Sequence, residues 1–195
     1  RGIFMGGTRT PNPLSADIDY ITIATTGTSI DSGGDILAAA EQTGGTASST
    51  RAFGIGGMAP SQVNTIQFMT ISTLGNTADF GDLTVARRNG GPCSNSVRAL
   101  YAGGDTPTNQ DVIDYVTMAT LGNAVDFGDL SAGRGNGAGV ASPTRCVMMG
   151  GTAPGYVTTI EYVQTMTTGN GVNFGYLNTQ GTAFSAGASN GHGGL

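Results

Sequence analysis

The sequence is poor in the residue types that are common in helical or strongly cationic proteins. It contains no lysine and no tryptophan, a single histidine, and only two glutamates, Glu41 and Glu161. All eight cationic residues are arginines, and charged residues make up 11% of the chain. Threonine, serine and the 34 glycines separate short runs of Val, Ile, Met and Tyr. Such a composition argues against a helical enzyme and predicts an all-β protein.

Charge and hydropathy argue against two further classes of protein, those that bind nucleic acid and those that span a membrane. The net charge is −5, and Arg87-Arg88 is the only cluster of basic residues, so a phosphate-binding face for nucleic acid is not expected. No apolar run approaches the length needed to cross a membrane, so no membrane insertion is expected. The two cysteines, Cys93 and Cys146, occupy non-equivalent positions in the pattern described next, and we expect both to be free thiols.

The chain does contain an internal repeat. Arg1, Arg51, Arg98 and Arg145 each open a copy, at steps of 50, 47 and 47 residues. In every copy a glycine pair, an aromatic residue within an apolar run, a turn glycine and an Asp or Asn follow at nearly fixed spacing. A repeat of this length with several short strands predicts a solenoid or a propeller. We therefore expect one domain over residues 1–195, made of repeats 1–50, 51–97, 98–144 and 145–191.

Each repeat divides into four predicted strands. In the third copy these are Ala99–Ala102, Val112–Thr120, Asp126–Leu130 and a small-residue stretch, Gly135–Ala141. The second run carries apolar groups on both of its faces, so its sheet should be covered on both sides, as a propeller blade is.

The stretches rich in Gly, Ala and Ser predict the innermost strand of each blade, where backbones converge and side chains have little room. By this assignment the chain begins at the second strand of its first blade. The segment Ala183–Asn190 would then supply the missing inner strand and close a ring of four blades. Because four blades make a narrow ring, a larger ring shared between chains is the alternative.

The glycine pair, the aromatic residue in the next strand and the later Phe80, Phe127 and Phe174 resemble the kelch repeat, whose units form four-stranded propeller blades. The chain departs from kelch in having phenylalanine where tryptophan is usual, and Ser32 in the first copy. The pattern is also similar to repeats of structural proteins of marine phages, including cyanophages, which are rich in segments such as Ile113–Thr117 and Asp126–Leu130. This resemblance covers the whole chain and implies a virion component, for example of a tail fibre.

The sequence offers few residues that could form a catalytic site. His192 has no partner histidine, and the aspartates Asp79, Asp82, Asp126 and Asp129 recur with the repeat. We interpret the aspartates as turn residues that bond backbone amides, rather than as calcium ligands. The opening arginines are expected to pair with these aspartates or with strand-end carbonyls. No catalytic residue, metal site or cofactor is predicted.

Topology predicts one candidate contact surface. In an up-and-down blade, the loop between the second and third strands and the link to the next blade emerge on the same face, and here these segments differ most among the copies. We call it the loop face. Its candidate ligand-binding residues are Arg9, Arg87, Arg88, Arg134 and Tyr156; the alternative is that these are solvated loop residues without a ligand.

The leading functional hypothesis is a non-enzymatic structural and adhesion module of a virus particle, located in the virion or outside cells. Its partners would be other virion proteins, further copies of itself or a glycan of the host surface. A kelch-like protein-interaction domain of non-viral origin is the alternative. A propeller hydrolase or oxidase is disfavoured because the site chemistry is missing.

Overall fold

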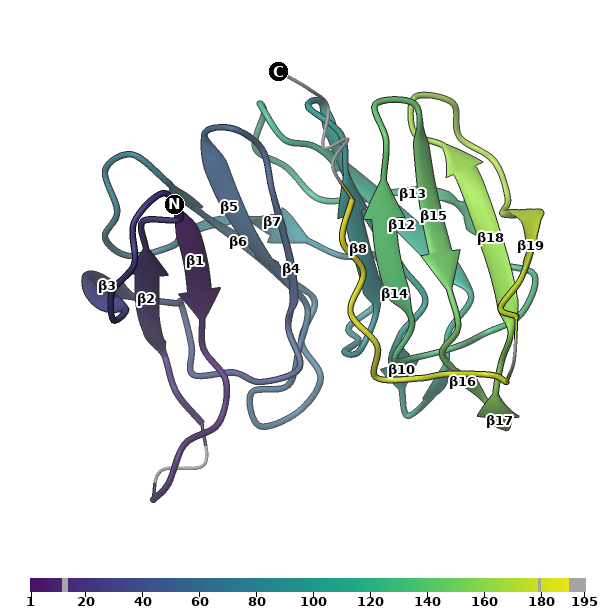
Figure 1. Cartoon of the computed structure of the whole chain (residues 1–195), viewed down its shortest axis with the longest axis horizontal. Coiled ribbons are helices and arrows are strands. Elements are labelled where there is room, and N and C mark those ends of the chain that lie inside the picture. Colours follow the sequence, from purple (N-terminus) through teal and green to yellow (C-terminus); the bar gives the residue numbers. More distant parts are fainter. Residues whose placement is uncertain (12–13, 179, 190–195) are drawn as a thin grey trace.

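The computed structural model describes residues 1–11, 14–178 and 180–189 of the chain. Within these ranges it contains strands and no helix, so none of the described segments is a helix that could span a membrane. The strands form four antiparallel sheets that succeed one another along the sequence, together with two short hairpins (Figure 1). The prediction of an all-β fold is confirmed.

The first sheet has three strands and each of the others has four. In the order in which neighbours pair, the first sheet consists of β1 (Gly2–Met5), β2 (Asp17–Ile21) and β3 (Ile30–Asp35); the second of β4 (Gly44–Ala47), β5 (Arg51–Ile55), β6 (Thr65–Thr70) and β7 (Ala78–Asp82); the third of β8 (Gly91–Ser94), β9 (Arg98–Ala102), β12 (Val112–Thr117) and β13 (Val125–Asp129); the fourth of β14 (Ala138–Ala141), β15 (Arg145–Met149), β18 (Thr159–Gln164) and β19 (Val172–Tyr176). The hairpins are β10 (Asp105–Thr106) with β11 (Thr108–Asn109), and β16 (Thr152–Ala153) with β17 (Gly155–Tyr156).

The register of strand pairing repeats with the sequence. Ile3 pairs with Tyr20 in the first sheet, and Phe53 pairs with Phe68 at the same place in the second. The tight turn before the second strand also recurs, because Ser48, Asn95 and Ser142 each accept a hydrogen bond from the amide three residues later. Such side chains stabilise turns by satisfying backbone donors.

The hydrophobic core lies in layers between neighbouring sheets. Between the second and third sheets it includes Phe53, Phe80 and Tyr101, and between the third and fourth it includes Leu100 and Phe127. In β12, Ile113 belongs to one layer and Val116 to the other. This confirms the expectation that the central strands are covered on both sides.

A recurrent set of backbone bonds joins each sheet to the next. The turn glycine Gly122 of the third sheet donates its amide proton to the Phe80 carbonyl oxygen, and the Asn123 side chain accepts from the Asp82 amide. Gly169 and Asn170 make the equivalent bonds to Phe127 and Asp129. We call this set of contacts the sheet junction.

One glycine shows how close this approach is. Gly81 has a φ of 147°, and a Cβ atom placed on it would lie 2.4 Å from the Gly122 carbonyl oxygen. Only glycine satisfies both conditions, since any side chain would collide with backbone and also strain this dihedral angle. The glycine pattern of the sequence thus reflects contacts between sheets.

The small-residue strands lie side by side, as predicted. Thr46 of β4 donates to Ser94 of β8 over 2.7 Å, and a Cβ atom on Gly139 of β14 would lie 2.3 Å from the Pro92 carbonyl oxygen of β8. Residues 181–189 continue this series next to β14, although they form no strand. The Phe184 amide donates to the Asn136 carbonyl oxygen over 2.9 Å. A Cβ atom on Gly187 would lie 2.5 Å from Val140 of β14.

The prediction that residues 183–190 close the ring within one chain is wrong for the described residues; Asn190 lies outside them. Among the described residues β2 is the only strand that pairs with β1, and residues 184–189 run along β14, well separated from β1 (Figure 1). The physical reason is that each inner strand stacks on the preceding one, so residues 184–189 follow β14. Each end of the array therefore lacks a neighbour among the described residues.

Candidate functional site

The predicted loop face exists. The link from β7 to β8 meets the hairpin of the next sheet through an Arg88–Asp105 bridge, and Gly135 meets Thr152 in the same way one repeat later. In Figure 1 these segments lie along the lower edge of the molecule, with β10, β16 and β17. The prediction that both kinds of connection emerge on one face is confirmed.

Arg88 lies in this face as one member of a polar cluster. Its Nε donates to Asp105 Oδ2 over 2.9 Å, its Nη1 lies 2.9 Å from the Met58 sulfur, and Asn89 Nδ2 donates to the other Asp105 oxygen over 2.8 Å. The Arg88 side chain remains 27% exposed. It is therefore held in place while part of its guanidinium surface faces solvent.

Tyr156 and Arg9 lie on the same face but on different sheets. Tyr156 in β17 is 68% exposed and borders a depression of about 380 Å³ with Asn109, Thr152 and Pro154. Arg9, in the β1–β2 loop, pairs with Asp17 and keeps 58% of its side chain exposed. Arg9, Arg88 and Tyr156 are thus spread along the face, and their role in binding stays a prediction.

The expectation that Arg87 lies on the exposed face is wrong. Its side chain is completely buried, and its Nη1 bonds to Asp114 Oδ2 over 2.9 Å. The same guanidinium donates to the carbonyl oxygens of Gly103 (2.8 Å) and Tyr101 (3.0 Å). A charge removed from water in this way requires a partner charge and satisfied donors, and Arg87 has both. Arg87, in the link that follows the second sheet, therefore bonds that link to the third sheet.

Arg134 repeats this arrangement one unit later, and its expected exposure is equally wrong. It is 6% exposed, and its Nη2 bonds to Glu161 Oε2 over 2.6 Å. Burial lowers the pKa of its guanidinium, whereas the Glu161 carboxylate opposes that shift. In the first junction the corresponding residues are Ala40 and Gln67, so the ion pair is present at two of the three junctions.

The arginine that opens each repeat lies over the aromatic ring of the same repeat. The guanidinium of Arg98 is 4.3 Å from the Tyr115 ring centre, and that of Arg51 is 4.6 Å from the Phe68 ring centre. Arg51 also donates to the Met118 carbonyl oxygen of the next sheet, and Arg98 to that of Thr165. The expected pairing with strand-end carbonyls is confirmed for Arg51 and Arg98; the aromatic partners were not foreseen.

The recurring aspartates behave as turn residues. Asp79 accepts a hydrogen bond from the Gly81 amide and Asp126 accepts one from the Gly128 amide, as predicted. Both cysteines are free and buried, and burial raises the pKa of Cys93. Among the described residues no three His, Cys, Asp or Glu side chains gather where they could hold a metal ion together.

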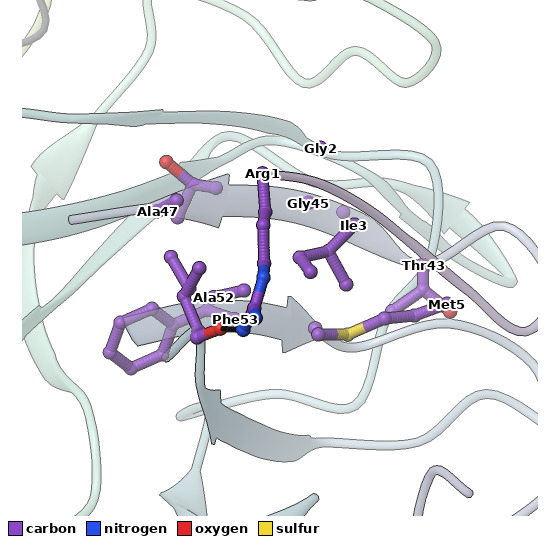
Figure 2. Close-up of a pocket in the computed structure, with 13 residues that line it drawn as sticks. Arg1, Gly2, Ile3, Met5, Thr43, Gly45, Ala47, Ala52 and Phe53 are labelled. Atoms are coloured by element: carbon purple, nitrogen blue, oxygen red, sulfur yellow. Dashed lines mark hydrogen bonds between the residues drawn. The ribbon is translucent and has the colours of Figure 1, made fainter. Parts of the chain in front are cut away.

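A second hollow, which was not among the predicted sites, lies between the first and second sheets. It has a volume of about 390 Å³ and is lined by residues of β1, β4 and β5, among them Ile3, Met5 and Gly45, together with Arg1 and Thr43 (Figure 2). We call it the β1 groove. Its place corresponds to that of the inner strand that the first sheet lacks. The signal in the sequence was the start of the pattern at a second strand.

Comparison with known proteins adds no relative to this picture. Neither the protein-family models nor the curated proteins match the sequence.

Proposed function

We propose that this protein is a non-enzymatic structural and adhesion module of a virus particle, built as a propeller-like array of kelch-like sheets. It contacts other virion proteins or a host-surface glycan through its loop face. The observation that carries the binding role is the exposure of Tyr156, Arg88 and Arg9 on the face where the repeats differ most. The virion assignment rests on the resemblance to marine phage repeats.

The acidic groups support a non-catalytic role because the structure already uses them. Asp79 and Asp126 bond backbone amides, while Asp114 and Glu161 neutralise buried arginines. A general acid or base must instead reach a substrate from a cleft.

The chemistry of the loop face fits a polar partner. An exposed tyrosine offers a flat apolar ring and a hydroxyl group, and a partly fixed arginine offers directed donors. Both features suit sugar rings with hydroxyl and carboxylate groups as well as polar protein surfaces.

The test of the loop face is a binding comparison. The Arg88→Ala/Tyr156→Ala variant should melt close to the unaltered protein, since Tyr156 is exposed and the partly exposed Arg88–Asp105 pair contributes at most about 1 kcal/mol. It should lose binding to a panel of bacterial surface glycans, or to purified virion proteins encoded beside its gene. Leu121→Ala is the matched control because Leu121 is 63% exposed in the β12–β13 turn, at the opposite ends of the strands from the loop face. Phe127→Ala, which alters a buried residue, should instead lower the melting temperature.

Two results would overturn the proposal. If the double variant binds as well as Leu121→Ala, the face is assigned wrongly. If no capsid or tail gene lies near the gene for this protein, the virion role loses its support.

A further inference from the structure

The core layer between the third and fourth sheets contains both cysteines of the chain. Cys93 lies on β8, the inner strand of the third sheet, and Cys146 lies on β15 of the fourth (Figure 1). Their exposed fractions are 4% and 0%, and both belong to one cluster of buried side chains that also includes Leu100 and Met148. Neither thiol takes part in the loop face or in the buried ion pairs described above.

The register of the strands directs both side chains into this layer. Residues that lie opposite each other on neighbouring strands point to the same face of a sheet, and so do alternate residues of one strand. Gly139 of β14 faces β8, because a Cβ atom on it would lie 3.4 Å from the Cβ atom of Cys93. Ala141, two residues further along β14, lies opposite Cys146. Cys146 therefore shares the face that Gly139 turns toward Cys93.

The close approach of β8 and β14 brings the two thiols into contact. A Cβ atom on Gly139 would lie 2.3 Å from the Pro92 carbonyl oxygen, so only glycine permits this separation of the strands. The contact perturbs both thiols: burial raises the pKa of Cys93 and Cys146 raises it further, whereas the hydrogen bond with Cys93 lowers the pKa of Cys146 against the effect of burial. The Thr165 hydroxyl also donates to the Cys146 sulfur, over 3.8 Å.

The thiol pair belongs to this junction and not to the repeat as a whole. One repeat earlier, at a step of 47 residues, Thr46 and Ala99 take the places of Cys93 and Cys146. In the remaining copies Val140 corresponds to Cys93 and Ala52 to Cys146. The non-equivalent positions of the two cysteines follow from the geometry, since contacts across a junction join the inner strand of one sheet to the second strand of the next.

We propose that Cys93 and Cys146 form a disulfide when the protein folds in an oxidising medium, and that this bond joins the third sheet to the fourth. The structure shows the reduced form, in which the pair is a buried dithiol. Media outside cells favour such a bond, whereas a reducing cytosol keeps the pair as thiols. The inference does not depend on the loop face, so it stands apart from the proposed adhesive role.

The oxidant in this step is a small-molecule disulfide. The thiolate of one cysteine attacks it, which forms a mixed disulfide and releases one small thiol. The thiolate of the other cysteine then attacks the protein sulfur of the mixed disulfide, which forms the Cys93–Cys146 bond and releases the second small thiol. Two electrons and two protons thus pass from the protein to the small disulfide. Because both thiols are buried in the folded chain, the exchange takes place during folding or a local opening of the junction.

The first test identifies the bond. The 195-residue chain is refolded from denaturant with oxidised glutathione, and in parallel with a reducing agent. After unfolding, an alkylating reagent should label both cysteines of the reduced chain and neither cysteine of the oxidised one, which should be two hydrogen atoms lighter. Trypsin, which cuts after arginine, should release residues 89–98 and 146–195 of the oxidised chain as one linked species that separates on reduction.

The second test measures the effect of the bond on stability. The oxidised chain should melt about 10 °C above the reduced chain, because the bond closes a loop of about 50 residues and constrains the unfolded state. Cys146→Ala is the matched control, since Ala52 and Ala99 occupy this position in other repeats. Its melting temperature should be the same under both conditions, and its remaining thiol should be labelled after refolding in reducing agent.

Four results would overturn the proposal. The first is a chain that keeps two thiols open to labelling after refolding with oxidised glutathione. The second is glutathione that stays attached to Cys93 or Cys146 as a mixed disulfide, and the third is a disulfide that links only separate chains. The fourth is an oxidised chain that melts no higher than the reduced one.

Discussion

Replacement of Arg87 by alanine should destabilise the protein far more than its place in a basic dipeptide would suggest. The change leaves Asp114, which is fully buried, without its positive partner, and it removes a donor from the carbonyl oxygens of Gly103 and Tyr101. Breaking a buried ion pair from one side costs about 3–5 kcal/mol. The amide and the hydroxyl of Thr84 still donate to the Asp114 carboxylate, so we expect a loss of about 4 kcal/mol.

Urea unfolding followed by circular dichroism measures this loss as a shift in midpoint at constant slope. Arg88→Ala is the control, because the Arg88–Asp105 pair is partly exposed and should contribute at most about 1 kcal/mol. Adding Asp114→Asn to Arg87→Ala should recover about 1–2 kcal/mol, since the amide still accepts from Thr84 but carries no charge. The reasoning is refuted if Arg87→Ala unfolds within about 1 kcal/mol of Arg88→Ala.

Two further predictions concern a tyrosine and a pair of glycines. Burial raises the pKa of Tyr101 from 10.0 to about 12, so its contribution to stability is full below pH 10 and is lost as the pH rises to about 12. Tyr101→Phe should flatten that part of the stability profile and cost about 1 kcal/mol at neutral pH, where the Gly90 amide loses its acceptor. Gly128→Ala should be much more destabilising than Gly122→Ala in thermal unfolding, although their φ angles are 144° and 146°. A Cβ atom on Gly128 would lie 2.5 Å from the Gly169 carbonyl oxygen, whereas one on Gly122 meets nothing within 4 Å, and equal losses would contradict the packed junction.

The strands could be predicted well because they repeat. The expected strand Ala99–Ala102 is observed as Arg98–Ala102, and the small-residue stretches contain β8 and β14. Glycine spacing and period-two apolar patterns are local properties that a sequence displays directly. The expected strand over Val112–Thr120 ends earlier, at Thr117.

The loop face was predicted only in part, because adjacent residues in a link have opposite environments. Nothing local distinguishes Arg87, which is buried, from Arg88, which is partly exposed. The signal that distinguishes them lies in the repeat step: Arg134 follows Arg87 by 47 residues, and Glu161 follows Asp114 by 47. Arg88 has Gly135 at the same step. Recurrence at that distance marks Arg87 and Arg134 as part of the architecture.

The course of the C-terminal segment was not predictable from the repeat alone. Between Leu177 and Thr182 the chain has one residue more than between Leu130 and Arg134, and no composition rule shows how such an insertion is absorbed. Its position along β14 depends on backbone bonds, such as that from Phe184 to Asn136, which form only once the fourth sheet is in place.

The buried ion pairs also constrain how such a gene can lengthen or shorten by recombination. Each pair draws its arginine from one unit and its acid from the next, so neighbouring units are not interchangeable. Loss of residues 98–144 would place Arg87 opposite Glu161 and restore a pair of the same chemistry. Loss of residues 51–97 would instead place Ala40 opposite Asp114 and bury a carboxylate without its cation, at a cost of about 3–5 kcal/mol. Changes in copy number that keep an arginine-bearing unit ahead of an acid-bearing one are therefore the tolerated ones.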